Sequence, residues 1–480
     1  MKQIKNVICK ILLFAMLTLT PGCTALVCAA SEARAAESRY DMRQMLPPVR
    51  NQGDFSTCWS FAIIGAIESN LIKKGVASRD IDLSEYYLSY YTFNDESETL
   101  YSFQSDKETG FDTGASDFMS TAIVTRGTGP VYESEAPYPH RKAKAVKPPV
   151  TARKFKLKNV LYLGEDASDI PLAGERINVV KAAIAQYGGA SAALCCPDED
   201  GVVMDDLLSP SYGYFTNFKS GEPEQGANYR EANHDVLLVG WDDSFSRLKF
   251  GGRNGRGPKP AKDGAWIVRN SWGKGWGDKG CFYVSYEEGT LVNGIVYDAV
   301  PAVQDENIYQ YDILGVADFI NGDFVPLISK NRAIPAWGAN IYTALRDERL
   351  NSAAVYTARP GTQCELKIYT SVGAGSPING TLALTKSVTL DAPGFHSIDL
   401  PAPVVVKKGE RFSVVMKLTA PASEFPIPVE MRVAGDTTHK KSTSHPGESW
   451  ISASGKYWTD LNTIDETANV CIKIYGTPEK

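Results

Sequence analysis

Residues 51–62 read NQGDFSTCWSFA and place Cys58 between a glycine turn and an apolar run. From Cys58 onward, apolar residues fall on one face of a 3.6-residue period, at positions 59, 63, 67 and 71. Gly75 follows as a stop, so the pattern predicts a buried helix that begins at or next to Cys58. A helix N-terminus favours a thiolate through its unpaired N–H groups and its dipole. Taken alone, such a cysteine is more often a packed core thiol, and half of a disulfide or a metal ligand are further alternatives.

The segments that follow divide the chain into two kinds of structure. Helical runs are expected at 84–91 and near 115–125, and strand-like runs separated by glycine turns follow at 189–194, 234–241, 265–270 and 281–286. Helices first and strands later predict an α+β domain with two lobes. After about residue 303 the chain alternates strand-like runs with Pro, Gly and Ser turns, which predicts an all-β sandwich of roughly 170 residues.

A nucleophilic thiol needs a base, and histidine suits that task near neutral pH. Outside the all-β region only His140 and His234 are candidates. His140 lies in YPHRKAK, a proline-flanked run that is typical of a solvated loop, whereas His234 begins the strand-like run HDVLLVGW. A side chain on a strand can be presented rigidly into a cleft, so His234 is the better base.

Three more residues complete a candidate site. Asn270, in VRNSWGKGWG, can accept the imidazole N–H through its side-chain oxygen, and Trp272 can cover that hydrogen bond from water. Gln52 can donate its side-chain amide, together with the Cys58 backbone N–H, to a developing oxyanion. Each residue alone has an ordinary structural explanation, as a turn or a core side chain. The combination predicts a cysteine nucleophile with its catalytic partners.

The net charge and the N-terminal segment indicate which partners and which cellular location to expect for this chain. The chain has 480 residues and a net charge of −6, so nucleic acid is not an expected partner. A basic stretch at 141–158 contains two adjacent prolines and is expected to be a solvated loop. Residues 1–30 combine an early positive segment with a short apolar segment, which predicts a signal peptide and export. Lipidation of Cys23 is the less favoured alternative.

Six cysteines follow the signal peptide, and none forms a C-x-x-C pair, so neither a zinc site nor a disulfide framework is indicated. Adjacent Cys195 and Cys196 are expected to be two thiols. Cys364 and Cys471 lie in strand-like runs, and a disulfide between them is a minority alternative.

The stretches NQGDFSTCWSFA, NHDVLLVGW and NSWGKGWGDKGCFYVSY together resemble the papain (C1) family of cysteine peptidases. The resemblance covers roughly residues 38–300 and implies a fold with a helical lobe and a β-barrel-like lobe, within a domain at 31–303. It implies Cys58 as the nucleophile, His234 as general base and acid, Asn270 as the residue that orients the imidazole, and Gln52 as the oxyanion donor. Hydrolysis through an acyl-enzyme, with no cofactor, is the implied chemistry.

The chain also departs from that family. Phe55 and Phe111 stand where the family usually has two half-cystines, so apolar packing is expected to replace the bridge. The loop RLKFGGRNGRGPKPAKDG at 247–264 is a basic insertion that could serve as a lid, as a nicking site or merely as a solvated loop. Only about eight residues separate the predicted signal cleavage near Ala30 from the mature-like start near Ser38, so no conventional pro-segment is expected.

The resemblance extends to substrate binding. DTGASDFMSTAIV is similar to the glycine substrate wall and its following helix, with Gly114 in the wall. Asp235 directly follows His234, where the family lines the S2 pocket, and its carboxylate would favour Lys or Arg at P2 unless it is paired internally. Trp272 is expected at the same cleft.

Residues 304–480 resemble the lectin-like β-sandwich of bacterial cell-surface cysteine proteases. Trp450, Tyr457 and Trp458 could stack on a cell-surface glycan, although core positions are favoured for them. A calcium ion in this domain is left open, with no ligands assigned. The expected function is a secreted or envelope cysteine endopeptidase acting on polypeptides. The alternatives are a transpeptidase or exopeptidase with the same site, or an envelope-binding protein.

Overall fold

A computed structural model describes most of the chain, namely residues 34–94, 100, 110–139, 146–164, 170–197, 203–221, 229–322, 333–433 and 438–479. The predicted signal peptide at 1–30, with Cys23, lies outside the described residues, as does His140. Within the described ranges, every helix is too short or too polar to cross a membrane.

The predicted helices are confirmed. They are α3 (Cys58–Lys73), α4 (Glu85–Phe93) and α5 (Asp117–Thr125), and a later helix, α6 (Arg176–Tyr187), packs against β3 (Ala190–Leu194), β7 (His234–Asp242) and β10 (Val292–Pro301) of the second lobe. Ser84 and Ser116 cap α4 and α5 by accepting hydrogen bonds from backbone N–H groups of the first turn. Thr57, at the start of α3, makes no such capping bond. The first N–H groups of α3 therefore have no side-chain cap.

The second lobe is built from strands, and the four predicted strand runs are confirmed. Its strands are β1 (Arg39–Asp41), β2 (Phe155–Tyr162), β3 (Ala190–Leu194), β4 (Gly213–Tyr214), β7 (His234–Asp242), β8 (Ala265–Arg269), β9 (Cys281–Ser285) and β10 (Val292–Pro301). Shorter elements join them, namely α7 (Met204–Leu207), β5 (Lys219–Ser220), β6 (Tyr229–Arg230), η1 (Glu133–Glu135) and η3 (Arg247–Lys249). The fold is the predicted two-lobed α+β domain.

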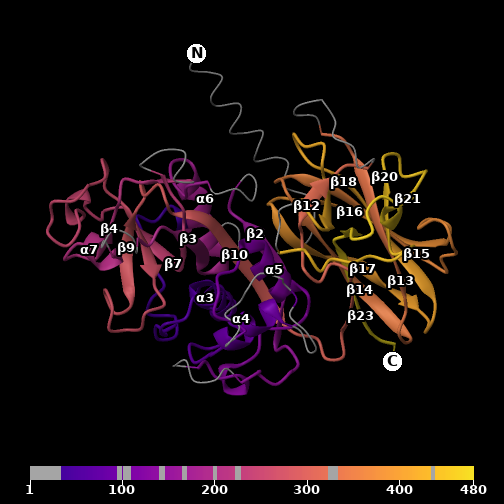
Figure 1. Ribbon diagram of the computed structural model, residues 1–480, viewed down its shortest axis with the longest axis horizontal. Coiled ribbons are helices and arrows are strands. Elements are labelled where there is room, and N and C mark those ends of the chain that lie inside the picture. Colours follow the sequence, from indigo (N-terminus) through magenta and orange to yellow (C-terminus); the bar gives the residue numbers. More distant parts are fainter. Residues whose placement is uncertain are drawn as a thin grey trace, which may run out of the picture.

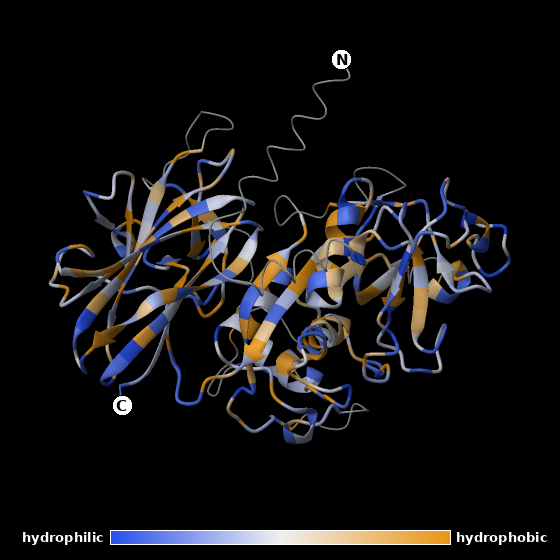
Figure 2. Cartoon of the chain, turned by 180° about the vertical axis from the view of Figure 1, so that it is seen from behind, coloured by the Kyte–Doolittle hydropathy of each residue, from blue (hydrophilic) through white to orange (hydrophobic). Residues whose placement is uncertain are grey.

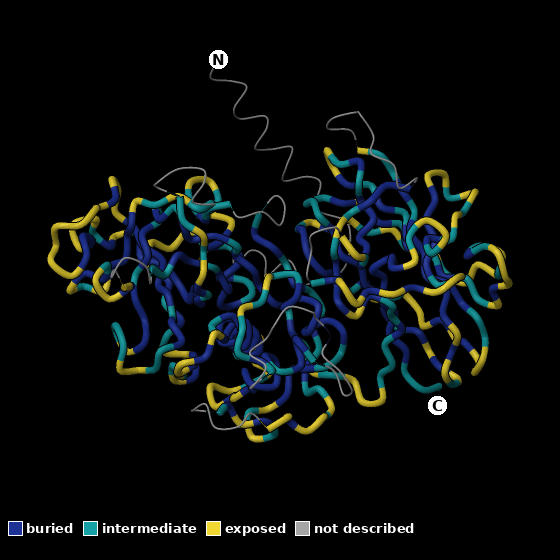
Figure 3. Tube along the Cα trace, in the orientation of Figure 1, coloured by how far each residue is buried: buried dark blue, intermediate teal, exposed yellow. Residues whose placement is uncertain are grey.

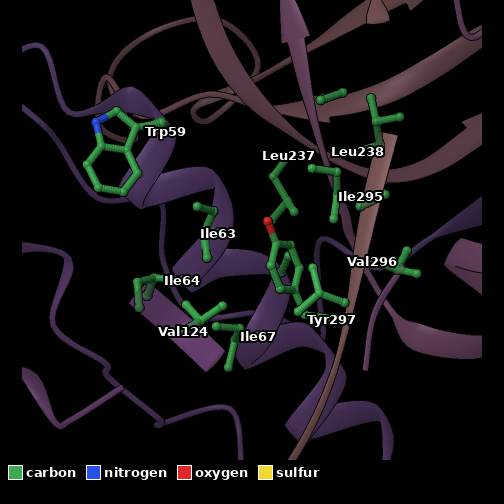
Figure 4. Packing of buried hydrophobic residues seen from close by; sticks show 14 of the residues in the cluster. Trp59, Ile63, Ile64, Ile67, Val124, Leu237, Leu238, Ile295, Val296 and Tyr297 are labelled. Atoms are coloured by element: carbon green, nitrogen blue, oxygen red, sulfur yellow. The ribbon is translucent and has the colours of Figure 1, made fainter. Parts of the chain in front are cut away.

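Helix α3 lies between the two lobes. Figure 4 shows Ile63 and Ile67 of α3 facing Leu237 of β7 and Tyr297 of β10, and all four side chains are buried. A Cβ on Gly65 would lie 2.9 Å from Leu237 Cδ2, so glycine lets the helix approach β7 closely. Burial of each large apolar side chain contributes roughly 1.5–3 kcal/mol. This packing fixes the start of α3 against the start of β7.

The C-terminal domain is all-β, as the sequence predicts. A six-stranded sheet has the order β16-β15-β18-β13-β20-β21, and a three-stranded sheet has the order β12-β19-β22. Their bounds, with those of the remaining strands, are β11 (Asn307–Tyr309), β12 (Asp318–Ile320), β13 (Ala336–Thr343), β14 (Glu348–Thr357), β15 (Thr362–Thr370), β16 (Thr381–Leu390), β17 (Gly394–Val406), β18 (Arg411–Thr419), β19 (Ile427–Glu430), β20 (Ser449–Ser452), β21 (Thr459–Asp460), β22 (Asn469–Val470) and β23 (Ile472–Pro478). One short helix, η4 (Leu461–Thr463), follows β21.

The strands of this domain alternate hydrophobic and hydrophilic residues, as Figure 2 shows. On β15, Leu366 and Ile368 are buried while their neighbours are partly exposed. They pack with Val355 of β14 and Val414 of β18 in one apolar cluster between the sheets. The two packed layers form the predicted sandwich.

One continuous sheet joins the two domains, which the sequence did not predict. Its order is β11-β23-β14-β17-β2-β10-β3-β7-β8-β9-β4, and β1 pairs with β7. Strand β17 of the C-terminal domain pairs antiparallel with β2, with Phe395 opposite Val160. Figure 1 shows β2 and β10 between β3 and the C-terminal strands. The shared backbone hydrogen bonds hold the domains together.

The expectation of a solvated loop across 141–158 is therefore wrong for its last residues, which begin β2. Phe155 and Leu157 alternate with lysines and face the core, a period of two that the basic residues obscure. Lys156 pairs with Glu306 at 2.5 Å, and Lys158 pairs with Asp399 of β17 at 2.5 Å. The positive charges thus bind acidic groups of the chain itself.

The cysteines of the C-terminal domain are not bridged. Cys364 on β15 and Cys471 before β23 are buried free thiols, so the minority disulfide alternative is wrong. Cys364 belongs to the six-stranded sheet, whereas Cys471 lies between β22 and β23 of other sheets. Cys195 and Cys196 are reduced thiols, as expected.

Aromatic packing takes the place of the missing bridge of the helical lobe, as predicted. The ring centroids of Phe55 and Phe111 lie 5.0 Å apart, and Phe61, Tyr86 and Tyr138 complete the buried cluster. Phe111 is fully buried. The cluster ties the loop before Cys58 to the segment that carries Gly114.

Replacement of Phe111 by alanine is expected to lower the free energy of unfolding by about 3–5 kcal/mol, because a large buried ring is lost and a cavity remains. Thermal unfolding of the full chain measures the effect, with the exposed Leu345→Ala as the control. A loss below about 1 kcal/mol would show that the aromatic cluster does not stabilise this lobe.

Candidate active site

Three chain segments meet at the N-terminus of α3. Cys58 is the first residue of α3, His234 is the first residue of β7, and Asn270 directly follows β8. Strands β7 and β8 pair antiparallel, with Leu237 opposite Arg269, so the start of β7 lies beside the end of β8. This register brings His234 and Asn270 together although 36 residues separate them.

A hydrogen bond fixes the His234 ring. Its Nε2 lies 2.8 Å from Asn270 Oδ1, and the Ser271 backbone N–H donates to the same oxygen at 2.8 Å. A backbone N–H can only donate, so the amide oxygen faces these two groups. His234 Nε2 must then carry the proton, which leaves Nδ1 as the basic nitrogen.

Two tryptophans shield this hydrogen bond. The Trp272 ring lies 5.0 Å from the His234 ring, centroid to centroid, at a tilt of 35°. Trp276 packs edge-on against Trp272 at 5.0 Å. Both His234 and Asn270 are buried. Trp272 therefore lies against the His234 ring, and its covering role stays a prediction.

The electrostatics of Cys58 reflect opposing effects. Burial raises the pKa of its thiol, while backbone N–H groups of Asp235, Trp59 and Cys58 itself act in the opposite direction. Burial lowers the pKa of His234, opposed by the Asn270 hydrogen bond and the negative charge of Asp235. Burial alone thus favours a neutral thiol and a neutral imidazole, and the charged pair depends on the surrounding N–H groups and on mutual attraction.

Both polar atoms of the Gln52 side chain form hydrogen bonds that hold it in place. Its Oε1 accepts a hydrogen bond from Ser271 Oγ, and its Nε2 donates to Phe55 O at 2.7 Å. The backbone of Gln52 also donates to Ser271 O at 2.8 Å. An amide nitrogen carries two hydrogens, so the bond to Phe55 O leaves one N–H of Gln52 for a further acceptor.

A second layer supports the loop before Cys58. Tyr138 Oη donates to Gln52 O at 3.0 Å and lies 2.6 Å from Thr57 Oγ1. Arg50, two residues before Gln52, pairs with Glu68 of α3 at 2.6 Å and Glu85 of α4 at 2.5 Å. Burial raises the pKa of each glutamate to about 7, partly offset by Arg50.

The proposed substrate wall lies beside α3. Trp59 Nε1 donates to Thr113 O at 3.0 Å, and Asp112 Oδ1 accepts from the Ser56 backbone N–H at 2.6 Å. Gly114 is exposed, and a Cβ built on it meets open space. Packing within the protein therefore does not require a glycine at this position.

Asp235 lies next to the site and is half-buried. Its pKa is raised well above its usual range, first by burial and then by the negative charges of Cys58 and Asp117, while His234 opposes the shift. Among the described residues, none forms an ion pair with the Asp235 carboxyl. This disfavours the alternative of an internal salt bridge.

The structure thus brings Cys58, His234, Asn270, Gln52 and Trp272 to one place, while their chemical roles stay predictions. Sequence reasoning missed the supporting residues Ser271, Tyr138 and Asp117. Ser271 lies within the quoted NSWG run, whereas nothing in the local sequence links Tyr138 to Gln52.

In the described part of the chain, no three His, Cys, Asp or Glu side chains are grouped to hold a metal ion, so no residue there is assigned to calcium.

The β-domain aromatics differ in exposure. Trp450 is buried and Trp458 is partly buried, each donating its indole N–H to a nearby backbone oxygen at 3.2 Å. Tyr457 is 74% exposed. Tyr457 is therefore the most exposed of these three aromatic residues, and Lys456 Nζ lies over its ring, 5.2 Å from the centroid.

Two curated relatives align with about half of this chain. A protein of Blomia tropicalis named "Cysteine protease" is 30% identical over 264 residues, covering 54% of this chain and 64% of that protein. "Cysteine proteinase 1" of Entamoeba histolytica (strain ATCC 30459 / HM-1:IMSS / ABRM) is 28% identical over 247 residues, covering 51% of this chain and 61% of that protein. The chain thus spans less than two thirds of the length of these relatives.

Solved structures of one protein are similar over both domains. The cysteine protease and lectin-like domains of Cwp84, a surface layer associated protein of Clostridium difficile, match with a TM-score of 0.72 and 23% identity, covering 92% of this chain and 89% of that one. A second Cwp84 structure, after propeptide cleavage, matches with a TM-score of 0.71 and 24% identity, covering 92% and 100%. At this identity the match shows a shared fold.

Family models match both parts of the chain. A model described as "Lectin like domain" matches residues 308–476. A model described as "Papain family cysteine protease" matches residues 36–200 and 203–300, more than half of the chain. This chain belongs to the papain family of cysteine proteases.

Proposed function

We propose that this chain is an exported cysteine endopeptidase that hydrolyses polypeptides at the cell envelope. The observation that carries the proposal is the His234–Asn270 hydrogen bond of 2.8 Å beside the helix that begins with Cys58. A fixed imidazole, a thiol at an uncapped helix N-terminus and a held amide donor are the parts that acyl transfer needs. No cofactor is required for this chemistry.

In the first half of the reaction, the Cys58 proton moves to His234 Nδ1 and the thiolate Sγ attacks the scissile carbonyl carbon. The C=O electrons move to the oxygen, which accepts hydrogen bonds from the Cys58 N–H and Gln52 Nε2. The tetrahedral intermediate collapses, and the amine leaves with the proton from Nδ1. A thioester between Cys58 and the acyl group remains.

In the second half, His234 Nδ1 takes a proton from water, and the hydroxide attacks the thioester carbon. The same two donors stabilise the new oxyanion. Collapse expels the Cys58 thiolate and releases the carboxylic acid product, while the proton returns to the Cys58–His234 pair. The Asn270 oxygen keeps the ring orientation through both halves.

The envelope location rests on three supports. Residues 1–30 read as an export signal, the C-terminal part matches a lectin-like family model, and Cwp84, which shares the fold over both domains, is described as surface layer associated. The sheet shared through β2 and β17 would hold the peptidase site at a fixed position relative to any envelope component, such as a glycan, that the C-terminal domain binds.

Casein hydrolysis by the purified chain, together with labelling by a thiol-directed epoxide, tests the proposed activity. Mass spectrometry of the fragments identifies internal cleavage, and an added amine nucleophile reveals any transpeptidation. Release of single terminal residues alone would indicate an exopeptidase, and amine-capped products alone would indicate a transpeptidase. Either result would contradict the proposed endopeptidase.

Asp235 is expected to set a pH-dependent preference for Lys or Arg at P2. Because its folded pKa is raised, its carboxyl is neutral at low pH and becomes charged as pH rises through that pKa. The ratio of kcat/KM for P2 Lys over P2 Leu peptides should therefore increase with pH, by about fivefold. Asp235→Asn should flatten the profile, with the exposed Asp80→Asn as control; an identical profile in Asp235→Asn would remove Asp235 from the pocket.

A further inference from the structure

The insertion at 247–264 concentrates positive charge on one part of a negatively charged chain. It carries six cations and one acid, Asp263, while the whole chain has a net charge of −6; the cations are Arg247, Lys249, Arg253, Arg256, Lys259 and Lys262. All six are exposed. We call residues 247–264 the basic insertion.

The basic insertion is folded and attached to α7. The Arg253 N–H donates to Asp206 O at 2.9 Å, and the Gly257 N–H donates to Gly251 O at 2.7 Å. Gly252 has a φ of +66°, and a Cβ there would lie 2.9 Å from Asp206 O. Glycine at position 252 thus permits the close approach of the insertion backbone to Asp206 O, which attaches the insertion to α7.

The charges of the basic insertion are largely uncompensated. Arg253 pairs with Asp206 at 3.7 Å. Lys249 lies 4.9 Å from the centre of the Phe245 ring. Apart from Arg253, the cations of the insertion form no ion pair with the residues that the structure describes. The exposed segments at the α7 end of the molecule are visible in Figure 3.

A short chain of contacts connects the active site to this insertion. Trp272 packs on His234, Trp276 packs on Trp272, and Trp276 Nε1 donates to Asp205 Oδ1 of α7 at 2.8 Å. Asp206, the next residue of α7, holds Arg253. The basic insertion therefore continues the surface that begins at the Trp272 side of the site.

In the proposed reaction, the leaving half of the substrate lies on that side. Successive side chains of β7 point to opposite faces, so Asp235 and the Asp117 region lie on the other side from the His234–Trp272 contact. His234 must deliver its proton to the departing amine. A polypeptide whose C-terminal half leaves on this side would run past Trp272 and Trp276 toward α7.

We propose that the basic insertion is an exosite that binds acidic residues of the polypeptide substrate, several positions C-terminal to the scissile bond. The proposal rests on the proposed endopeptidase function and adds a substrate class to it. An extended chain advances about 3.3 Å per residue, so six acidic residues from P3′ to P8′ would cover about 20 Å beyond the site. Attraction between Asp or Glu side chains and the unpaired cations supplies the selectivity.

Paired internally quenched peptides test the exosite. The two peptides share residues P4 to P2′ and carry either Glu or Gln from P3′ to P8′. The wild-type ratio of kcat/KM, Glu peptide over Gln peptide, is expected to be about ten at low ionic strength and to approach one in about 1 M NaCl. In Arg256→Glu/Lys259→Glu/Lys262→Glu the ratio should fall to one or below.

The matched control is Lys408→Glu/Lys440→Glu/Lys456→Glu, which makes the same charge change on exposed lysines of the C-terminal domain and should keep the wild-type ratio. Thermal unfolding verifies that both triple variants fold. A wild-type ratio of one, or the same ratio in both triple variants, overturns the proposal.

Binding separates this proposal from the proposed function. Fluorescence anisotropy of the two peptides with the Cys58→Ala chain gives a ratio of Kd values without any cleavage. A preference for the Glu peptide that depends on the insertion supports the exosite even if the wild type cleaves nothing, an outcome that would reject only the peptidase. Insertion-dependent binding of polygalacturonate with no preference between the peptides would instead make the insertion a polysaccharide site and overturn the proposal.

Discussion

Cys58→Ala is expected to lower kcat/KM for casein-derived peptides by about 10⁴-fold or more, because no other side chain at the site can form the thioester. His234→Ala should lose a similar factor, since Nδ1 both accepts the thiol proton and returns it to the leaving amine. The double variant Cys58→Ala/His234→Ala should lose no more kcat/KM than either single variant, because the two residues act as one unit. Progress curves and epoxide labelling measure both losses.

The control for this pair is Cys364→Ala, which removes a buried thiol on β15 of the other domain. It should label and cleave like the wild type. Thermal unfolding of Cys58→Ala should stay close to that of the wild type, because a half-buried thiol contributes little packing. Cleavage that survives in Cys58→Ala would assign the nucleophile to another residue.

Gln52→Ala is expected to lower kcat by about 10²–10³-fold with little change in KM, because one oxyanion donor is removed at the stage where charge develops. Gln52→Glu should be equally impaired, since an ionised carboxylate cannot donate and would repel the oxyanion. Ser271 fixes the Gln52 oxygen, so the donor is held before substrate arrives. Such preorganisation is what makes a single N–H group effective.

Steady-state kinetics with separate kcat and KM values test this prediction, with the exposed Gln44→Ala of the same N-terminal segment as the control. A rise in KM at constant kcat would mean that Gln52 binds the ground state and not the oxyanion. In that case its amide would belong to substrate binding.

The aromatic cluster at Phe55 and Phe111 explains how the helical lobe keeps its catalytic loop rigid without a disulfide. Tyr138 belongs to that cluster and also donates to Gln52 O, so apolar packing and the oxyanion loop are directly coupled. A bridge at these positions would restrain two residues, whereas the cluster holds five rings around the same loop. Stability and site geometry therefore depend on the same buried side chains.

Much of the fold was predictable because its signals are local. The 3.6-residue period after Cys58, the serine caps of α4 and α5 and the alternation on β15 each lie within one short segment. The candidate site residues also stand at the ends of such segments, because Cys58 begins α3, His234 begins β7 and Asn270 directly follows β8. Strand β2 was missed because its alternation falls among lysines and follows two prolines.

The sequence by itself determined the two-lobed fold and the β-sandwich, and it predicted which side chains react, since each inference depends on residue types at short spacing. Only the tertiary structure decided that β17 joins β2, that Ser271 holds Gln52, that Asp117 and Asp235 share one side of the site, and that the basic insertion lies on α7. These contacts join segments far apart in the chain. Their geometry depends on how sheets and helices pack, which no single stretch of sequence encodes.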